Sequence, residues 1–425
     1  MLLKAYVGDS SGKAKRVKKI YEGNSSNKAK LVYNKNNETS ELMHYELNGT
    51  NKNINKAYIG DQDGKAQLIY NPTVISKTLN AERLSVQVSN TSRPILALNS
   101  NYVVCCGTGS NYNGTQAISK NYILTSASSL SDLRQGSSGA TVGDYAFFAG
   151  GSDASSGSGQ YKYSTRTDGY NSNLVRTSGG TLSQARTFEG IDSTSDYVIC
   201  AGGFYNAGNN GSWGACNNVD AFNTNLTKTS MSNLSYKTED YAIGHVNNSV
   251  ILGGGLQRPS NWTNISTVYK WSNSLSMTTL TSLPNPGTNC TSCSIDNYCL
   301  FANIYAQYPY PNYNNNTLYR FCVAYNNNFT RITCTNPTYD GTLGRGFSCD
   351  RKALFMIDGY TYGNDSTNTP NNVYIESYDE NLVKSIINLY VESNLSYAYG
   401  VNLESNKLLR VGSYTDLYSF KDNYA

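Results

Sequence analysis

Aromatic side chains in polar, loop-like stretches are the residues of this chain with the clearest capacity to bind a ligand. The longest such stretch, YAQYPYPNYNNNTLY over residues 305–319, is stiffened by Pro309 and Pro311. Three shorter stretches, FYNAGNNGSWGACNN, LQRPSNWTN and GYTYGND, add aromatic residues and one arginine. The candidate ligand contacts are Tyr305, Tyr308, Tyr310, Tyr313, Trp213, Trp262, Arg258, Tyr360 and Tyr362.

The composition of these stretches is typical of binding surfaces. Tyr and Trp offer rigid, amphipathic contact area, and Asn, Ser and Gly offer adaptable hydrogen bonds. Aromatic rings beside Asn and Asp also suit sugars. For any single tyrosine the alternative is that it only covers the strands below it. For the set as a whole, we expect contact with a glycan or protein ligand.

Residues for catalysis or metal binding are few. Cys290 and Cys293 form one C-x-x-C motif, but no second pair stands at zinc spacing, and His44 and His245 are the only histidines. Carboxylates are sparse, and no pair is evident in the sequence. We therefore expect no metal, no cofactor and no enzymatic activity. The C-x-x-C motif is interpreted as core filling, like the cysteines within apolar runs.

The elements that would position the aromatic stretches form a repeat. Seven apolar runs, spaced 43 to 55 residues apart, begin at Tyr102, Tyr145, Tyr197, Ser249, Tyr298, Lys352 and Lys407. Each run is apolar at consecutive positions, which predicts a strand buried on both faces. Glycine pairs follow three runs, at Gly150–Gly151, Gly202–Gly203 and Gly253–Gly254, where the backbone must leave the sheet. A phosphate loop is disfavoured because no helical pattern follows.

A second marker divides each unit into four strands, a to d. Most units continue into an aromatic residue, polar residues and an apolar one, as in YNSNL, FNTNL, WSNSL, YNNNF and YDENL. Asn and Asp cap their own backbone and tolerate left-handed conformations, so this motif predicts a tight turn between strands c and d. The seventh unit lacks strand d, and residues 73–84 resemble one. We expect this N-terminal strand to complete the last unit and close a ring.

The first 72 residues follow another pattern. KAYVGDSSGKAKRV, KIYEGNSSNKAKLVY and KAYIGDQDGKAQLIY are copies of one hairpin, and the polar segment between copies two and three is interpreted as a loop or linker. Basic residues dominate the first two copies, among them Lys13, Lys15, Arg16, Lys18 and Lys19. They form either a solvated edge that discourages strand pairing or a docking surface for an acidic partner.

Two resemblances follow from these motifs. Residues 73–425 resemble a kelch-type seven-bladed β-propeller in their period of about 50 residues and in the glycine pairs. They depart from it in the fifth copy, CLFANIYA, and in the scarcity of the strand-d tryptophan. The domains expected are thus an N-terminal hairpin module, 1–72, and an all-β, kelch-like propeller, 73–425. Kelch-type oxidases need two histidines in the propeller, which holds only His245, and no sialidase-type turn is found.

The lysine-rich hairpins resemble those in tail, baseplate and receptor-binding proteins of phages of low-GC Gram-positive bacteria. This resemblance implies a virion or phage-tail-like particle protein, made in the host cytoplasm without a signal peptide, whose N-terminal module docks to the tail or baseplate. Tail proteins of this kind are often trimers, so a homo-oligomer is one expectation. The alternative is a structural baseplate or decoration protein whose propeller binds another virion subunit.

Charge and topology complete the expectations. With 34 Lys and Arg against 30 Asp and Glu, the chain has no strong field for nucleic acid, and no apolar run is long enough for a membrane span. Alternating strand directions put the a–b and c–d turns at one face and the b–c loops at the other. The aromatic stretches are b–c loops, and we expect them to face away from the N-terminal module and toward a bacterial cell-surface receptor.

Overall fold

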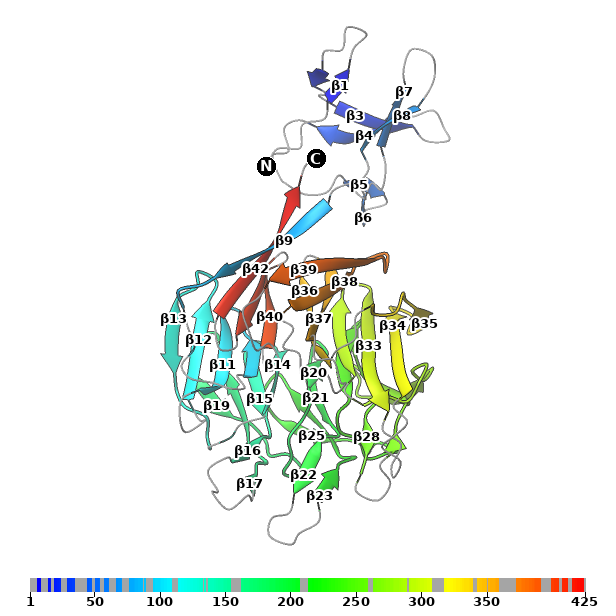
Figure 1. The fold of residues 1–425 in the computed structure, drawn as a ribbon. Coiled ribbons are helices and arrows are strands. Elements are labelled where there is room, and N and C mark those ends of the chain that lie inside the picture. Colours follow the sequence, from blue (N-terminus) through cyan, green and yellow to red (C-terminus); the bar gives the residue numbers. More distant parts are fainter. Residues whose placement is uncertain are drawn as a thin grey trace. The chain divides into compact units, whose positions relative to one another are not determined.

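In the computed structural model, the described residues among the first 80 are those that lie in strands. From residue 81 to 423 the structure describes the chain except residues 87, 89–94, 109–113, 133, 135–136, 154–161, 207–212, 259–262, 289, 308–316, 339–341, 350, 359–371, 391–398, 405–406 and 412–414. All regular elements in this part of the chain are strands, so the protein is all-β (Figure 1). The described residues contain no helix of the length and apolarity that a membrane crossing requires.

The chain divides into two compact units, one of residues 1–78 and 421–425 and one of residues 79–420. The first contains four two-stranded hairpins: β1 (Tyr6–Gly8) with β2 (Ala14–Arg16), β3 (Lys19–Gly23) with β4 (Ala29–Asn34), β5 (His44–Leu47) with β6 (Thr50–Asn53), and β7 (Ala57–Gly60) with β8 (Ala66–Tyr70). Three of them share one register, in which Gly8, Gly23 and Gly60 stand opposite Ala14, Ala29 and Ala66.

The hairpin β5–β6 corrects the sequence-based interpretation of this segment as a loop or linker. Leu47 stands opposite Thr50, so only Asn48 and Gly49 connect the two strands. Asn-Gly is the dipeptide that two-residue hairpin turns favour, because both central residues take positive φ. The polar composition of the segment concealed this signal.

Seven four-stranded antiparallel sheets make up the rest of the described strands, apart from three short hairpins treated below. Sheets 1 to 3 are β10 (Ile95–Leu98), β11 (Tyr102–Thr108), β12 (Gly114–Ser119), β13 (Leu124–Ala127); β14 (Ser138–Val142), β15 (Tyr145–Ala149), β18 (Thr167–Tyr170), β19 (Arg176–Ser178); and β20 (Asp192–Ser193), β21 (Tyr197–Ala201), β24 (Val219–Asn223), β25 (Lys228–Ser230).

Sheets 4 and 5 are β26 (Ala242–Val246), β27 (Ser249–Gly253), β30 (Val268–Ser272), β31 (Met277–Leu280); and β32 (Thr291–Ile295), β33 (Tyr298–Gln307), β34 (Thr317–Asn326), β35 (Arg331–Thr333). Sheets 6 and 7 are β36 (Thr342–Cys349), β37 (Lys352–Asp358), β38 (Asn372–Tyr378), β39 (Lys384–Tyr390); and β40 (Tyr399–Glu404), β41 (Lys407–Val411), β42 (Thr415–Asn423), β9 (Ser76–Arg83).

The arrangement of these sheets follows the repeat in the sequence. The second strand of every sheet begins at the residue that opens an apolar run, from Tyr102 in sheet 1 to Lys407 in sheet 7. The N-terminal strand β9 lies beside β42 as the fourth strand of sheet 7. The first strands of consecutive sheets contact one another in chain order, and β40 of sheet 7 also contacts β10 of sheet 1. The contacts between first strands therefore form a closed circuit.

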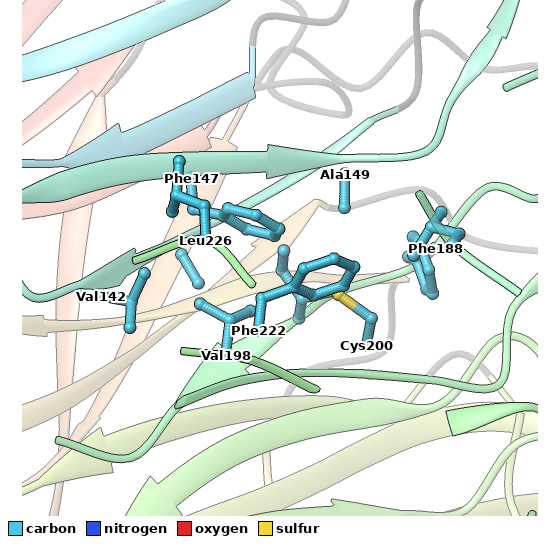
Figure 2. Close-up of a cluster of buried hydrophobic side chains, with 11 residues drawn as sticks. Val142, Phe147, Ala149, Phe188, Val198, Cys200, Phe222 and Leu226 are labelled. Carbon is cyan, nitrogen blue, oxygen red and sulfur yellow. The ribbon is translucent and has the colours of Figure 1, made fainter. Parts of the chain in front are cut away.

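The hydrophobic core lies between consecutive sheets. Phe147 packs with Val198 and Phe222 of sheet 3 (Figure 2). Neighbouring residues of one strand point to opposite sides, so Phe148 packs instead with residues of sheet 1. Both phenylalanines are fully buried. This explains why the second strands are apolar at consecutive positions, as the sequence predicts.

The turn between third and fourth strands recurs in sheets 1 to 6 with one left-handed residue each, and in sheets 2, 3, 5 and 6 an Asn or Asp side chain caps it. In sheet 2 the Asn171 side chain accepts hydrogen bonds from the backbone N–H groups of Asn173 and Val175, both 3.0 Å long. The left-handed residue, however, is Leu174 (φ 59°), where the sequence favoured an asparagine. Leu174 packs against the core cluster between sheets 1 and 2. This contact partly buries the leucine side chain, which offsets the modest cost of its backbone conformation.

Candidate binding site on the hairpin loops

Three short hairpins extend the connections between the second and third strands of sheets 2, 3 and 4. They are β16 (Ser152–Asp153) with β17 (Lys162–Tyr163), β22 (Phe204–Asn206) with β23 (Trp213–Ala215), and β28 (Leu256–Gln257) with β29 (Thr263–Asn264). Figure 1 shows the first two side by side at one end of the seven-sheet unit, and β17 contacts β22 as β23 contacts β28.

A glycine pair starts each hairpin. Gly202 and Gly203 have φ of 64° and 102°, and a Cβ on Gly203 would overlap the carbonyl oxygen of Thr187. Gly203 also donates its N–H to the carbonyl oxygen of Thr238, 2.9 Å away, in the connection that leads into sheet 4. Both conformational freedom and close approach therefore require glycine here. In sheet 4 the left-handed pair is Gly254–Gly255, one residue beyond the predicted Gly253–Gly254, because Gly253 is the last residue of β27.

Backbone hydrogen bonds tie the hairpins to neighbouring sheets. Phe204 exchanges bonds of 2.9 and 3.0 Å with Thr187, and Leu256 exchanges bonds of 2.7 and 3.1 Å with Glu239. The N–H of Ala215 donates to the carbonyl oxygen of Arg258 over 3.0 Å, which joins the hairpins of sheets 3 and 4. The strands of these hairpins are thus anchored by backbone hydrogen bonds, which favours a preorganised binding surface.

Four side chains from the three hairpins form one cluster, which we call the aromatic–arginine cluster: Tyr163, Phe204, Trp213 and Arg258. The Phe204 ring lies 5.9 Å from Tyr163 and 6.1 Å from Trp213, measured between ring centroids. The Arg258 guanidinium lies 5.2 Å from the Phe204 centroid and 5.7 Å from that of Trp213, within cation–π range. Trp213 remains 39% exposed, so part of the indole is open to a ligand.

An ion pair holds the arginine. Arg258 pairs with Glu239, whose side chain is almost fully buried, while the guanidinium keeps a solvent-exposed part. Burial lowers the pKa of Arg258, but the usual pKa of a guanidinium is so high that the group stays charged at neutral pH. The cluster therefore presents a fixed positive charge beside aromatic faces, which suits hydroxyl, carbonyl or carboxylate oxygens of a ligand.

One carboxyl pair lies near this arginine. Burial and the neighbouring Glu189 carboxyl raise the pKa of Asp240 to about 6, and the two side chains are hydrogen-bonded. Hydrogen-bonded carboxyls are closer than the roughly 5 Å or more that separates the carboxyl groups of glycoside hydrolases. The Asp240 carboxyl is therefore protonated below about pH 6 and adds negative charge above it.

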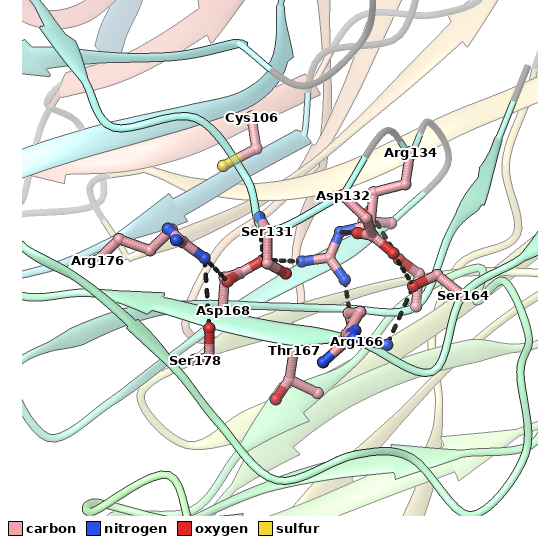
Figure 3. Close-up of polar contacts among 12 residues, drawn as sticks. Cys106, Ser131, Asp132, Arg134, Ser164, Arg166, Thr167, Asp168, Arg176 and Ser178 are labelled. Carbon is pink, nitrogen blue, oxygen red and sulfur yellow. Dashed lines mark hydrogen bonds and ion pairs between the residues drawn. The ribbon is translucent and has the colours of Figure 1, made fainter. Parts of the chain in front are cut away.

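A network of buried ion pairs joins the segment that precedes β14 to strand β18 (Figure 3). Asp168, at the start of strand β18, pairs with Arg134 and Arg176 and accepts hydrogen bonds from the N–H and hydroxyl of Ser131. Arg134 also donates to the carbonyl oxygen of Arg166, 2.5 Å away. Asp168 and Arg134 are both fully buried.

The same arrangement recurs one sheet later. Asp220 pairs with Arg186 at 3.1 Å and accepts hydrogen bonds of 3.0 Å from the N–H and hydroxyl of Ser183. Sequence reasoning missed these networks. The available signal was the repeated Leu-Ser-x-x-Arg at residues 130–134 and 182–186, each followed by an aspartate in the third strand.

The candidate ligand contacts from the sequence fall into three groups in the structure. Trp213 and Arg258, which stand 45 positions apart, are brought together, and Phe204, Tyr163 and Glu239 are the site residues that the sequence did not single out. Tyr305 lies in β33 opposite Tyr319 of β34, at the distal end of that strand pair. Trp262, Tyr308, Tyr310, Tyr313, Tyr360 and Tyr362 lie outside the described residues.

The basic residues of the first unit are described through their strands. Lys15 and Arg16 lie in β2, and Lys19 begins β3. Lys13 and Lys18 lie outside the described residues.

The two cysteines of the C-x-x-C motif belong to different hydrophobic clusters. Cys290 packs between sheets 4 and 5, and Cys293 packs between sheets 5 and 6. Burial raises the pKa of the Cys293 thiol to about 12. In the part of the chain that the structure describes, no group of three or more His, Cys, Asp or Glu residues is arranged for a metal ion.

Comparisons with known proteins add little. No family model and no curated protein matches the sequence. Among solved structures, one titled "Structure of YjhT" is similar with a TM-score of 0.48 and 13% sequence identity, over 72% of this chain and 98% of the other. A likeness at this level carries no argument about function.

Proposed function

We propose that this protein is a receptor-binding protein of a phage tail or phage-tail-like particle, and that its seven sheets are the blades of a kelch-like β-propeller. The closed circuit of contacts among the first strands, with β9 completing sheet 7, supports the propeller assignment. The hairpin module of the first unit is then the part that docks to tail or baseplate proteins, as its resemblance to phage hairpins implies.

The observation that carries the binding role is the aromatic–arginine cluster. It gathers side chains from three consecutive sheets, it is supported by backbone hydrogen bonds, and its indole is part exposed. Exposed aromatic and arginine residues on a rigid support are the usual centres of binding energy in interfaces. The connection between β33 and β34 carries Tyr308, Tyr310 and Tyr313 in its sequence, and we include it in the proposed receptor surface.

Binding of the purified full chain to intact low-GC Gram-positive cells tests this proposal. Truncation of a central aromatic contact costs about 2 kcal/mol or more, so Trp213→Ala should weaken cell binding at least about thirtyfold. Ile123→Ala is the matched control, because it removes an exposed apolar side chain (62% exposed) beside the turn between the third and fourth strands of sheet 1. The control should bind as the unaltered chain does, and the loss of the Trp213 contacts with Phe204 and Arg258 should lower the melting temperature by no more than a few degrees.

Competition and particle assays then identify the partner. Loss of cell binding in the presence of purified cell-wall glycan assigns the ligand to glycans, whereas protease treatment of the cells that abolishes binding assigns it to a protein. A chain that binds no cell, but binds other subunits of the particle through Trp213, is a structural baseplate or decoration protein instead.

A further inference from the structure

Two cysteines far outside the C-x-x-C motif lie directly across from each other in sheet 5. The register of β34 and β35 pairs Val323 with Thr333, which places Cys322 and Cys334 opposite one another one step further along. The N–H of Cys334 donates to the carbonyl oxygen of Cys322 over 2.9 Å, so the antiparallel pairing continues through this step. Their sequence separation of 12 residues gives no hint of this contact.

The geometry suits a covalent link. Residues opposite one another in an antiparallel pair have Cα atoms about 4.5–5.5 Å apart, within the roughly 4.4–6.8 Å that disulfides span. The two thiols are hydrogen-bonded to each other, and both side chains belong to the cluster between sheets 5 and 6. Cys322 is fully buried and Cys334 is 8% exposed.

We propose that Cys322 and Cys334 are a redox modification site, which a small-molecule disulfide converts into a cross-strand disulfide bond. This inference does not rest on the proposed function. Both residues pack in the hydrophobic cluster between sheets 5 and 6, and packing alone does not require two cysteines there.

The two thiols have different roles in the reaction. The hydrogen bond from Cys322 lowers the pKa of the Cys334 thiol, whereas burial raises that of Cys322 well above its usual value. Cys334 also follows the last residue of β35, the edge strand of its sheet, where local opening is easiest. Cys334 is therefore the attacking thiol and Cys322 the resolving one.

The chemistry is two successive exchanges. The Cys334 thiolate attacks one sulfur of the small disulfide, forms a mixed disulfide and releases one small thiolate. The Cys322 thiol then loses its proton and attacks the Cys334 sulfur, which forms the protein disulfide and releases the second thiolate. The protein dithiol is oxidised, and one small disulfide is reduced to two thiols.

Incubation of the folded, full-length protein with oxidised glutathione tests this assignment. We expect the intact mass to fall by two hydrogens, and a tryptic digest without reduction to contain residues 321–331 linked to residues 332–345, because trypsin cuts after Arg320, Arg331 and Arg345. Cys105→Ser, which removes a buried cysteine of β11 in another sheet, should leave the link intact.

Two variants separate the roles of the thiols. Cys322→Ser should stop at a mixed disulfide of glutathione on Cys334, and Cys334→Ser should leave Cys322 unmodified. A link between other cysteines, such as Cys290 and Cys293, would overturn the assignment. The assignment would also be overturned if the unaltered protein kept both thiols in two experiments. These are the incubation of the folded protein and its unfolding and refolding in a glutathione buffer.

Discussion

The Arg258 guanidinium lies 5.7 Å from the centre of the Trp213 ring, although the two residues extend from different sheets. The same guanidinium pairs with the buried carboxylate of Glu239. One side chain thus connects a part-exposed aromatic surface with a charge in the interior. Substitution of Arg258 should therefore affect both stability and the proposed binding, whereas substitution of Trp213 should act mainly on the proposed binding.

Replacing Arg258 should destabilise the protein. Arg258→Ala leaves the Glu239 carboxylate buried without this partner. We expect a cost of about 2 kcal/mol, below the roughly 3–5 kcal/mol of a fully buried pair, because solvent reaches part of the arginine. Thermal unfolding measures the effect. The double variant Arg258→Met with Glu239→Gln should recover most of the loss, and a single variant as stable as the unaltered chain would contradict the role of the ion pair.

The Asp168 network should be more sensitive still. Asp168→Ala leaves the fully buried Arg134 with only the Asp132 carboxylate, 3.3 Å from its Nε, as an ion-pair partner, and we expect a cost of about 3 kcal/mol with a large fall in melting temperature. Asp296→Ala is the control, since Asp296 is 75% exposed and lies 3.8 Å from Arg351. The control should cost less than about 1 kcal/mol. Equal effects of the two substitutions would show that burial of Asp168 is not decisive.

Two glycines separate conformational strain from close approach. Gly107 and Gly203 both have positive φ, 77° and 102°, but only at Gly203 would a Cβ overlap a backbone oxygen, that of Thr187. A Cβ on Gly107 would have its nearest neighbour, the carbonyl oxygen of Arg134, at 3.8 Å. Gly107→Ala should therefore cost about 1–2 kcal/mol from strain alone. Gly203→Ala should lower the melting temperature further and weaken cell binding, because it displaces the hairpin that carries Trp213.

A pH-dependent contribution to stability is expected at His245. Its Nδ1 lies 2.9 and 3.0 Å from the two carboxylate oxygens of Asp192, and this carboxylate raises the pKa of the imidazole above 6.5. The raised pKa means that the pair stabilises the folded state fully below about pH 6.5, the value of an unperturbed histidine. The contribution is lost as the pH rises through the folded-state pKa.

Melting temperatures across this pH range test the expectation. The difference in melting temperature between the unaltered chain and His245→Gln should be largest below about pH 6 and should shrink at alkaline pH. The contribution is modest because the imidazole is 53% exposed. A difference that stays constant with pH would show that His245 contributes only packing. Histidine resonances in an NMR titration report its pKa directly.

Several features followed from the sequence because they are local. The onset of each apolar run predicts where the second strand of each sheet begins. The likeness of residues 73–84 to a fourth strand predicts that the N-terminal strand β9 lies beside β42. Other features could not be predicted because they depend on neighbouring sheets. The left-handed residue of this turn in sheet 2 is Leu174, not an asparagine, and only the tertiary structure provides the core cluster between sheets 1 and 2 against which it packs.

The sequence by itself determined the all-β class, the seven repeats and the apolar faces of their central strands. Strand periodicity and turn chemistry depend on residues that are close together within each unit. Only the tertiary structure decided which side chains meet. Trp213 with Arg258, Asp168 with Arg134 and Cys322 with Cys334 are contacts between separate strands, hairpins or sheets. Their partners depend on register and on the order in which sheets pack, and a one-residue shift in register would send every such side chain to the opposite face.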